Sequence, residues 1–377
     1  MVVLPFTRLE AAAGGEIKLL DTRTISVESQ FYHGWPTVAR RANGELWVVW
    51  SGGRDGHICP MGQVHSMTSR DNGETWSWPR VLLDSPIDDR DSGALVTAKG
   101  TLLVTTFTSL AYEADLAKST NYTPDGKGPS IRPMSPEVIA RWKAAQNRLT
   151  ADERQAELGE WVLRSTDGGL NFSARIATIV NSPHGPLQLK DGRILYVGKQ
   201  LWTTEQRIGA VESKDDGLTW TWLSEIPGRP GDDVAHAYHE LHAVETDDAR
   251  IIAQIRHHGK VDTNSTLQTE SADGGKTWTI PRPIAFGYPS QLLKLRDGRL
   301  IMTYGHRRPP FGNQARVSSD HGRTWSEPMI VSGDGTAGDL GYPSTVELAD
   351  GTLLTIWYER LEGNNKAVLR QARWRLL

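Results

Sequence analysis

Six segments of the chain share one pattern, a polar turn followed by an apolar run rich in β-branched and aromatic residues. They read ANGELWVVW at 42–50, AKGTLLVTTF at 98–107, KDGRILYVG at 190–198, DDARIIAQIR at 247–256, RDGRLIMTYG at 296–305 and ADGTLLTIWY at 349–358. A tight turn before such a run is the sequence signal of a β-hairpin. The pattern therefore predicts six equivalent hairpins spread along the chain.

A second repeat alternates with the first and has the form S-x-D-x-G-x-T-W. Its five copies are SRDNGETW at Ser69–Trp76, STDGGLNF at Ser165–Phe172, SKDDGLTW at Ser213–Trp220, SADGGKTW at Ser271–Trp278 and SSDHGRTW at Ser318–Trp325. The Asp can accept bonds from backbone N–H groups ahead of it, the Gly can adopt a positive φ, and the aromatic can pack beneath the turn. We therefore expect these turns to be structural and to take no part in chemistry.

The spacing of the two repeats sets the number and size of the units. The octets begin 47 to 58 residues apart, except for an interval of 96 residues after Ser69 that holds only one strand segment. A repeat of this length fits a four-stranded propeller blade. The sequence therefore predicts an all-β fold, a six-bladed β-propeller that forms a single domain over residues 1–377. The last blade has no octet, and we expect Glu16–Ser29 to complete it.

The long interval predicts a helical insertion in the second blade, at about residues 110–160. Ser135 and Pro136 suit the N-cap and first position of one helix. Thr150 and Glu153 have the spacing of a capping box at the start of a second, short helix. The insertion is interpreted either as a flap over one face of the propeller or as a decoration that packs on its rim.

Composition and charge exclude several classes of function. The net charge of -3 and the isoelectric point of about 6.4 leave no basic surface for nucleic acid. No apolar run approaches the roughly 18 residues of a membrane span, and the single Cys59 cannot form an intrachain disulfide. The first residues lack the pattern of a signal peptide. We therefore expect a cytoplasmic protein, or a secreted or periplasmic one if a signal has been removed.

Polar residues gather about 9–10 positions before the turn glycines, where the innermost strand of each blade opens on the central cavity. The segments concerned are His33–Pro36, Asp88–Asp91, Pro183–Gly185, His239–His242 and Gly341–Ser344. Ionisable residues that converge from separate blades are the default candidate for an active site.

The five octets and six blades resemble the sialidase (neuraminidase) superfamily over nearly the whole chain outside the insertion. In that family a Glu and an Arg flank the turn glycine of blade 4, and a Tyr precedes the turn glycine of blade 6. Here Glu240 lies 9 residues before Ala249, which stands in the place of that glycine, and Arg256 lies 7 after it. Tyr342 lies 9 residues before Gly351. The resemblance implies that Tyr342 is a nucleophile and Glu240 its base, and that Arg256 binds a carboxylate.

Elementary electrostatics explains why a Tyr suits such chemistry. A substrate carboxylate beside the reacting carbon would repel an anionic nucleophile by roughly 4 kcal/mol at about 4 Å and an effective dielectric near 20. A neutral Tyr that a Glu deprotonates in place avoids this repulsion, and sialidases are the known exception of this kind among retaining glycosidases. Arginines can then hold the substrate carboxylate through paired hydrogen bonds.

The chain also departs from the family pattern. Gly34–Pro36 replaces the Arg-Ile-Pro motif of the first blade, and Arg90 occupies the equivalent position in the second blade. The third arginine of the family has Arg307 and Arg308 near its place. The proton donor is left open between Asp55, His57 and His33. The residues expected to bind substrate are Arg256, Arg90, Arg54, His33 and Arg307.

The resemblance therefore implies an exo-acting glycoside hydrolase that releases a terminal acidic sugar, sialic acid or a related nonulosonic acid. Its catalytic residues would be Tyr342, Glu240 and Asp55, in a retaining mechanism. We expect no cofactor and no metal, and an acidic glycan or glycoside as the partner, without nucleic acid or membrane. A polysaccharide lyase acting on uronates is the first alternative, and a non-catalytic propeller that binds glycan or protein is the second.

Overall fold

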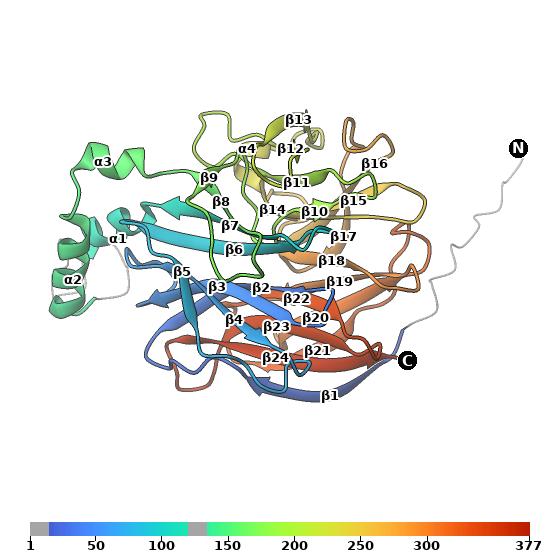
Figure 1. Ribbon diagram of the computed structural model, residues 1–377, viewed down its shortest axis with the longest axis horizontal. Coiled ribbons are helices and arrows are strands. Elements are labelled where there is room, and N and C mark those ends of the chain that lie inside the picture. Colours follow the sequence, from blue (N-terminus) through green and yellow to red (C-terminus); the bar gives the residue numbers. More distant parts are fainter. Residues whose placement is uncertain (1–14, 120–133) are drawn as a thin grey trace, which may run out of the picture.

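The computed structural model describes residues 15–119 and 134–377. Within these ranges the strands form six four-stranded antiparallel sheets (Figure 1). Each sheet is one blade, so the predicted six-bladed β-propeller is confirmed. Blade 1 contains β2 (Tyr32–Arg40), β3 (Leu46–Arg54), β4 (Gln63–Ser69) and β5 (Arg80–Leu83). Blade 2 contains β6 (Asp88–Val96), β7 (Leu102–Ser109), β8 (Glu160–Ser165) and β9 (Ile176–Ala177). Blade 3 contains β10 (Leu187–Gln188), β11 (Ile194–Lys199), β12 (Ile208–Ser213) and β13 (Thr221–Glu225).

Blades 4 to 6 follow in the same order around the ring. Blade 4 contains β14 (Tyr238–Glu245), β15 (Ile251–His257), β16 (Ser265–Ser271) and β17 (Arg282–Phe286). Blade 5 contains β18 (Ser290–Lys294), β19 (Leu300–His306), β20 (Phe311–Ser318) and β21 (Met329–Gly335). Blade 6 contains β22 (Leu340–Glu347), β23 (Leu353–Arg360), β24 (Ala367–Leu376) and β1 (Ile17–Thr24).

The sixth blade is completed by the N-terminal strand β1, which pairs with β24. Beyond the strand, the Ile25 amide donates to the Leu369 carbonyl at 2.8 Å, and the Leu369 amide donates to Ser26 Oγ at 3.1 Å. The prediction that Glu16–Ser29 closes the ring is confirmed.

The two repeats occupy equivalent places in successive blades. The six turn-plus-strand segments form the second strand of each blade, and the octets connect the third strand to the fourth in blades 1 to 5. Ala249, which replaces a turn glycine, adopts a φ of 62°. It therefore takes the left-handed conformation that glycine accepts at no steric cost.

Hydrogen bonds inside the first octet show why the motif has its sequence. Asp71 accepts from the Thr75 amide at 2.9 Å and from the Thr75 hydroxyl at 2.6 Å. Ser69 Oγ donates to Asp71 at 2.7 Å and accepts from the Gly73 amide at 2.9 Å. The Asp therefore closes the turn, as expected from the sequence.

The aromatic residue that ends each octet contacts the preceding blade as well as its own. Trp325 of blade 5 donates its indole N–H to Gln268 of blade 4 at 2.9 Å, and Trp278 of blade 4 donates to Ser224 on β13 of blade 3 at 3.0 Å. Trp220 packs in a cluster that includes Leu103 of blade 2. These aromatics therefore join neighbouring blades.

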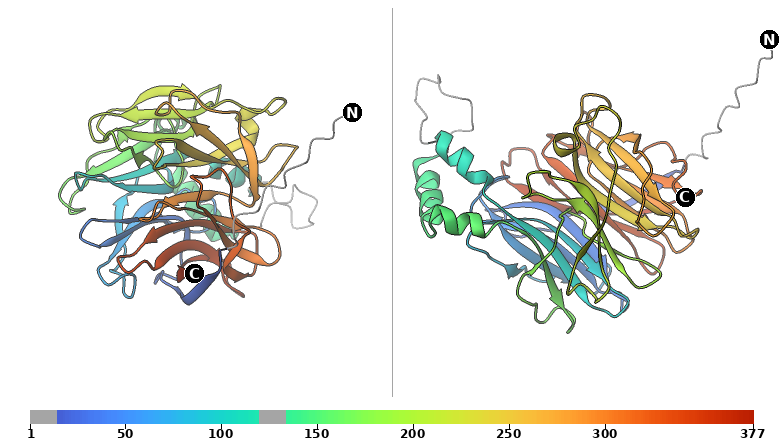
Figure 2. Two further views of the ribbon diagram at one scale, coloured as in Figure 1. Left: turned by 90° about the vertical axis from the view of Figure 1, so that its right-hand side faces the viewer. Right: turned by 90° about the horizontal axis from the view of Figure 1, so that it is seen from above.

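Three helices lie between β7 and β8 and stand out from the sheets on one side of the ring (Figure 2). They are α1 (Ala111–Ser119), α2 (Pro136–Gln146) and α3 (Ala151–Ala156), and a short α4 (Val234–Ala237) precedes β14. Ser135 accepts from the Val138 amide and caps α2, and Thr150 and Glu153 form the predicted capping box of α3. Within the described ranges, no helix is long and apolar enough to cross a membrane.

Candidate functional site

Three of the innermost strands carry the same irregularity near their start. Trp35 on β2, Asp91 on β6 and Tyr342 on β22 have φ values of 54°, 46° and 53°, and the pairing register with the next strand shifts at each of these places. A bulge of this kind re-aims a side chain and is tolerated where surrounding contacts compensate its cost. The rings of Trp35 and Tyr342 lie 6.4 Å apart as a result.

Tyr342, Glu240 and Arg256 form a closed triangle, although they come from blades 6 and 4. The Tyr342 hydroxyl donates to Glu240 Oε1 at 2.7 Å. The Arg256 guanidinium donates to the same carboxylate oxygen at 2.8 Å and lies 3.0 Å from the Tyr342 hydroxyl. The structure therefore brings together three residues that the sequence proposed as a unit.

The electrostatics of this triangle follow from burial and charge. Burial raises the pKa of the Glu240 carboxyl, but Arg256, with help from His239 and the Tyr342 hydroxyl, outweighs that effect and lowers it to about 2. Burial and then the Glu240 charge raise the pKa of Tyr342 well above 10. The resting site thus contains an ionised Glu240, a cationic Arg256 and a neutral Tyr342.

A second arginine lies next to the triangle. The Arg307 guanidinium is 5.0 Å from the Tyr288 ring centre and 5.6 Å from that of Tyr342, and Arg256 is 4.4 Å from the Tyr288 ring. Within the described part of the chain, Arg307 Nε and Nη2 are buried without a hydrogen-bond partner. Two guanidiniums, one with open donors, can bind a carboxylate ligand in the planar geometry that arginine favours.

His258 orients Arg256 from the other side. Arg256 Nε donates to His258 Nε2 at 2.6 Å, and the His258 ring lies 4.7 Å from Tyr288 in an edge-on arrangement. Burial and the charge of Arg256 lower the pKa of His258 to about 4, so the ring stays a neutral acceptor. No motif or spacing in the sequence singles out His258 for this role.

Arg90 and Arg54 both lie over the Trp35 ring, at 4.7 and 5.1 Å, but in different states. Arg54 is fully buried and donates to both oxygens of Asp88 at 2.6 and 3.0 Å. The positive charge of Arg54 is therefore paired with Asp88 inside the protein. Arg90 is half-buried, and its Nε has no partner among the described residues. Of these two predicted substrate ligands, Arg90 has the free donor.

Both ring nitrogens of His33 bond to protein groups. Its side chain is buried, Nε2 donates to the Glu28 carbonyl at 2.9 Å, and Nδ1 accepts from the Trp50 indole at 3.1 Å. Because both ring nitrogens are occupied, His33 holds the entry of blade 1 in place and has no nitrogen left for a substrate.

Asp55 and His57 lie on the loop after β3, facing the helical insertion. Asp55 accepts from Arg141 at 2.5 Å and from the Trp142 indole at 3.0 Å, both on α2. His57 Nδ1 lies 3.1 Å from Asp339 Oδ1, and its ring is 4.9 Å from that of Trp35. The Asp55 carboxylate thus anchors the insertion, while His57 lies beside the aromatic residues of the centre.

Asp91 is a residue of the centre that the sequence placed in the pocket without a role. One of its carboxylate oxygens is buried without a hydrogen-bond partner in the described ranges. Burial, only partly offset by Arg90, raises its pKa to about 7. The signal that could have singled it out is its register, which is the same as that of Tyr342.

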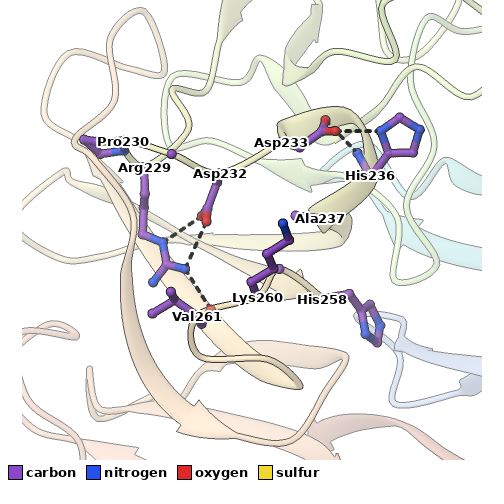
Figure 3. A pocket seen from close by; sticks show the side chains of 11 residues that line it. Arg229, Pro230, Asp232, Asp233, His236, Ala237, His258, Lys260 and Val261 are labelled. Atoms are coloured by element: carbon purple, nitrogen blue, oxygen red, sulfur yellow. Dashed lines mark hydrogen bonds and ion pairs between the residues drawn. The ribbon is translucent and has the colours of Figure 1, made fainter.

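Two pockets adjoin these residues. One, of about 700 Å³, lies beside Arg256, because His258 lines it together with Arg229, Asp232 and Lys260 (Figure 3). Its charges are paired, since Arg229 donates to Asp232 at 2.8 Å and Asp233 bonds His236 at 2.9 Å. The other, of about 890 Å³, is lined by His57 and α2. Among the described residues, no group of three His, Cys, Asp or Glu side chains is arranged to hold a metal.

Comparison with known proteins agrees with this architecture. Residues 131–355 match the family described as the BNR repeat-like domain. No curated protein matches the sequence significantly. A solved protein of unknown function from Dyadobacter fermentans superposes with a TM-score of 0.75 at 22% identity, covering 96% of this chain and 99% of that one.

Two sialidase structures are also similar. The Hadza microbial sialidase Hz136 gives a TM-score of 0.62 at 17% identity, over 90% of this chain and 65% of that one. The intramolecular trans-sialidase from Ruminococcus gnavus, solved with oseltamivir carboxylate, gives 0.62 at 13% identity, over 94% and 96%. At these identities the likeness shows a sialidase-like propeller fold.

Proposed function

Because the chain belongs to the BNR repeat-like domain family and folds as a sialidase-like propeller, we propose that it is an exo-acting glycoside hydrolase that releases a terminal acidic sugar. The observation that carries this proposal is the Tyr342 hydroxyl, which lies 2.7 Å from Glu240 and 3.0 Å from Arg256. Sialic acid or a related nonulosonic acid is the substrate class.

In the first step, Tyr342 Oη attacks the anomeric carbon while its proton passes to Glu240 Oε1. The bond from that carbon to the leaving oxygen breaks, and the oxygen takes a proton from the enzyme. In the second step water attacks the same carbon and gives a proton back to the group that protonated the leaving oxygen, while Tyr342 is displaced and recovers its proton from Glu240. The configuration is retained because two displacements occur.

The substrate carboxylate has a place in this scheme. Arg256 and Arg307 flank Tyr342, and the free donors of Arg307 supply hydrogen bonds that no protein group takes among the described residues. Arg90, stacked on Trp35, adds a third cation on the side where the first-blade arginine is missing. When the substrate carboxylate engages Arg256, Glu240 loses part of the charge that lowers its pKa and becomes a stronger base toward Tyr342.

The proton donor is assigned to His57 rather than Asp55. Both oxygens of Asp55 accept hydrogen bonds from α2, so neither is free to face a leaving group. Burial lowers the pKa of His57 below 6.5, while its bond to Asp339 opposes the shift. The protonated form of His57 therefore becomes the major form only below pH 6.5.

The test is a set of conservative variants with an acidic-sugar glycoside as substrate. Tyr342→Phe removes only the attacking oxygen, so turnover should fall by several orders of magnitude while stability falls by about 1.5–3 kcal/mol, the contribution of one hydrogen bond to a charged group. Glu240→Gln should be comparably harmful, and the double variant little worse than either. Tyr304→Phe, a buried Tyr on β19 whose hydroxyl bonds Gln314, is the control and should keep its activity.

A fluorinated acidic-sugar inactivator should add one sugar mass to Tyr342. An active Tyr342→Phe variant and an unlabelled wild type would exclude the covalent mechanism.

Elimination is the second candidate, and one observation favours it. Burial keeps His57 neutral near pH 7, and its bond to Asp339 is the arrangement of a general base. Incubation with a uronate-containing glycan distinguishes the two, because elimination leaves an unsaturated product that absorbs ultraviolet light and hydrolysis adds water. Binding without turnover of either substrate would support the non-catalytic alternative.

A further inference from the structure

The turns between the first two strands of the blades lie at the ends of the innermost strands that are remote from Tyr342. β2, for example, runs from Trp35 at the centre to Arg40 at its turn, a span of roughly 16 Å at about 3.3 Å per residue. A cavity of about 520 Å³, within the roughly 300–1,000 Å³ of typical ligand sites, lies between the turns of blades 1 and 2. The lining residues used below are Arg40, Arg41, Ala42, Val96 and Lys99.

In four of the six interfaces between blades, the same two positions join neighbouring turns. One position lies two residues before the turn glycine of a blade, and the other lies four residues before the turn glycine of the next blade; Ala249 counts as that glycine in blade 4. Three of these contacts run from a turn amide to a side-chain oxygen at 2.6 to 2.8 Å, from Ala98 to Gln188, from Lys190 to Glu245 and from Arg296 to Glu347. Between blades 4 and 5 the polarity is reversed, because the Asp247 carboxylate accepts from Lys294 at 3.1 Å.

The two interfaces on either side of blade 1 lack this contact. Between blades 1 and 2 the positions are Ala42 and Val96, and no described residue accepts a hydrogen bond from the Ala42 amide. Between blades 6 and 1 they are Ala349 and Arg40, so Arg40 lacks a carboxylate partner of the kind that Lys294 has. Within the described ranges the Arg40 side chain accordingly has no hydrogen bond or ion pair, although its Nε is buried. The cavity therefore lies where an acceptor is missing and a cation is unpaired.

The charge of the cavity is positive. Its lining contains three cations and no carboxylate. Arg41 donates to Glu45 at 2.5 Å, so its charge is balanced. Lys99 is exposed and has no ion pair in the described part of the chain. Arg40 and Lys99 thus present unpaired positive charge beside the free Ala42 amide.

We propose that this cavity binds an oxyanion, at the ends of the innermost strands that are remote from Tyr342. An oxygen of the anion accepts from the Ala42 amide, as the Glu245 and Glu347 carboxylates accept from turn amides elsewhere in the ring. Arg40 and Lys99 add charge-assisted hydrogen bonds. The bound anion joins blades 1 and 2 and is either free sulfate or phosphate or the acid group of a polysaccharide, which share this chemistry. The site does not depend on the proposed hydrolysis.

The experiment is calorimetric titration of the protein with sodium sulfate at constant ionic strength. Val96→Glu, at a half-buried position, supplies the missing carboxylate from within the chain and should abolish one sulfate-binding event. Lys99→Gln removes one cation and should weaken that event by about tenfold or more. Lys276→Gln makes the same change of charge at an exposed position of the blade-4 octet, where the described residues provide no ion pair, and should match the wild type.

The arginines around Tyr342 can bind a further sulfate ion, and this binding is common to the wild type and the variants. The difference between the proteins therefore reports the cavity alone. The same number of sulfate ions and the same affinities in the wild type, Val96→Glu and Lys99→Gln would overturn the proposal. If Val96→Glu does not fold, the comparison of Lys99→Gln with Lys276→Gln decides, and equal sulfate binding by these two proteins overturns it.

A second titration, with a sulfated disaccharide, distinguishes the two sources of the anion. Disaccharide binding at least about tenfold tighter than that of sulfate, and lost in Val96→Glu, would support the site with an acidic polysaccharide as the ligand. Disaccharide binding that is equal to or weaker than that of sulfate, with sulfate binding still lost in Val96→Glu, would support the site with a free anion as the ligand.

Discussion

The indole hydrogen bonds between blades lead to a prediction about how the ring is held together. Trp325 Nε1 donates to Gln268 Oε1 at 2.9 Å, and Gln268 is buried. Trp220, at the same place two blades earlier, is buried, but its Nε1 has no partner within the described ranges. Phe172 already serves at this position in blade 2, where it lies 6.2 Å from Trp47 of blade 1.

Trp→Phe at these positions removes part of the ring and the N–H, whereas Trp220→Ala removes the whole buried side chain and should cost about 3–5 kcal/mol. At Trp325, Trp→Phe also breaks a buried hydrogen bond, which should contribute about 1 kcal/mol. A double-mutant cycle of Trp325→Phe with Gln268→Met isolates that contribution from the volume change.

The assay is denaturant unfolding followed by circular dichroism, with turnover of an acidic glycoside measured on the same samples. The cycle should give a coupling energy of about 1 kcal/mol, and activity of the folded variants should be retained. A coupling energy near zero would refute the view that the indole N–H links the blades. Unchanged stability with lost activity in Trp220→Ala would refute the structural role of the octets.

Three further predictions follow from single residues. Ala249→Gly should raise stability by about 0.5–1 kcal/mol, because Ala249 has a φ of 62°. Gly192→Ala at the equivalent turn should lower stability by about 1 kcal/mol, because Gly192 has a φ of 90°, although there is open space for a Cβ. Thermal unfolding measures both changes. The pKa of Asp91 is raised to about 7 from 3.8, so its contribution to stability is full below pH 3.8 and lost as pH rises through 7. Asp91→Asn should therefore melt higher than the wild type at pH 8 and lose that advantage near pH 4, and the same melting difference at both pH values would contradict the assignment. If His57 donates the proton, kcat/KM for an acidic-sugar glycoside should decline as pH rises through a value below 6.5. The fluoride of the same acidic sugar, whose leaving group needs no proton donor, should show no such decline. The same decline with both substrates would exclude His57 as the donor.

The blades could be predicted from the sequence because their signals are local. The bonds of Asp71 to Thr75 and the positive φ of the turn residues lie within a few positions of one another. Tyr342, Glu240 and Arg256 could be placed for a related reason. Each lies a fixed number of residues from a turn, and these positions come into contact at the centre when the blades close into a ring.

The remaining site residues depended on contacts that no local pattern encodes. The sequence left the proton donor open between Asp55, His57 and His33, because the partners of Asp55 lie on α2, which the sequence could place only as a flap or a decoration. His33 and Trp35 are two residues apart, yet the bulge buries one against Trp50 and directs the other to the centre. Asp91 was placed in the pocket but given no role, because its raised pKa comes from burial beside Arg90, which depends on the neighbouring blades.

The closure of blade 6 by β1 has a consequence for biosynthesis. Ser26 and Leu369, which bond each other at the seam, are separated by 343 residues. The strand that closes the ring therefore precedes the other strands of all six sheets in synthesis, and its edge stays unpaired until β24 has been made. A chain released before β24 is synthesised contains five complete blades, β22 and β23 of the sixth blade, and an unpaired β1. Such a chain exposes the apolar seam between blades 1 and 6 and becomes a substrate for chaperones and proteases.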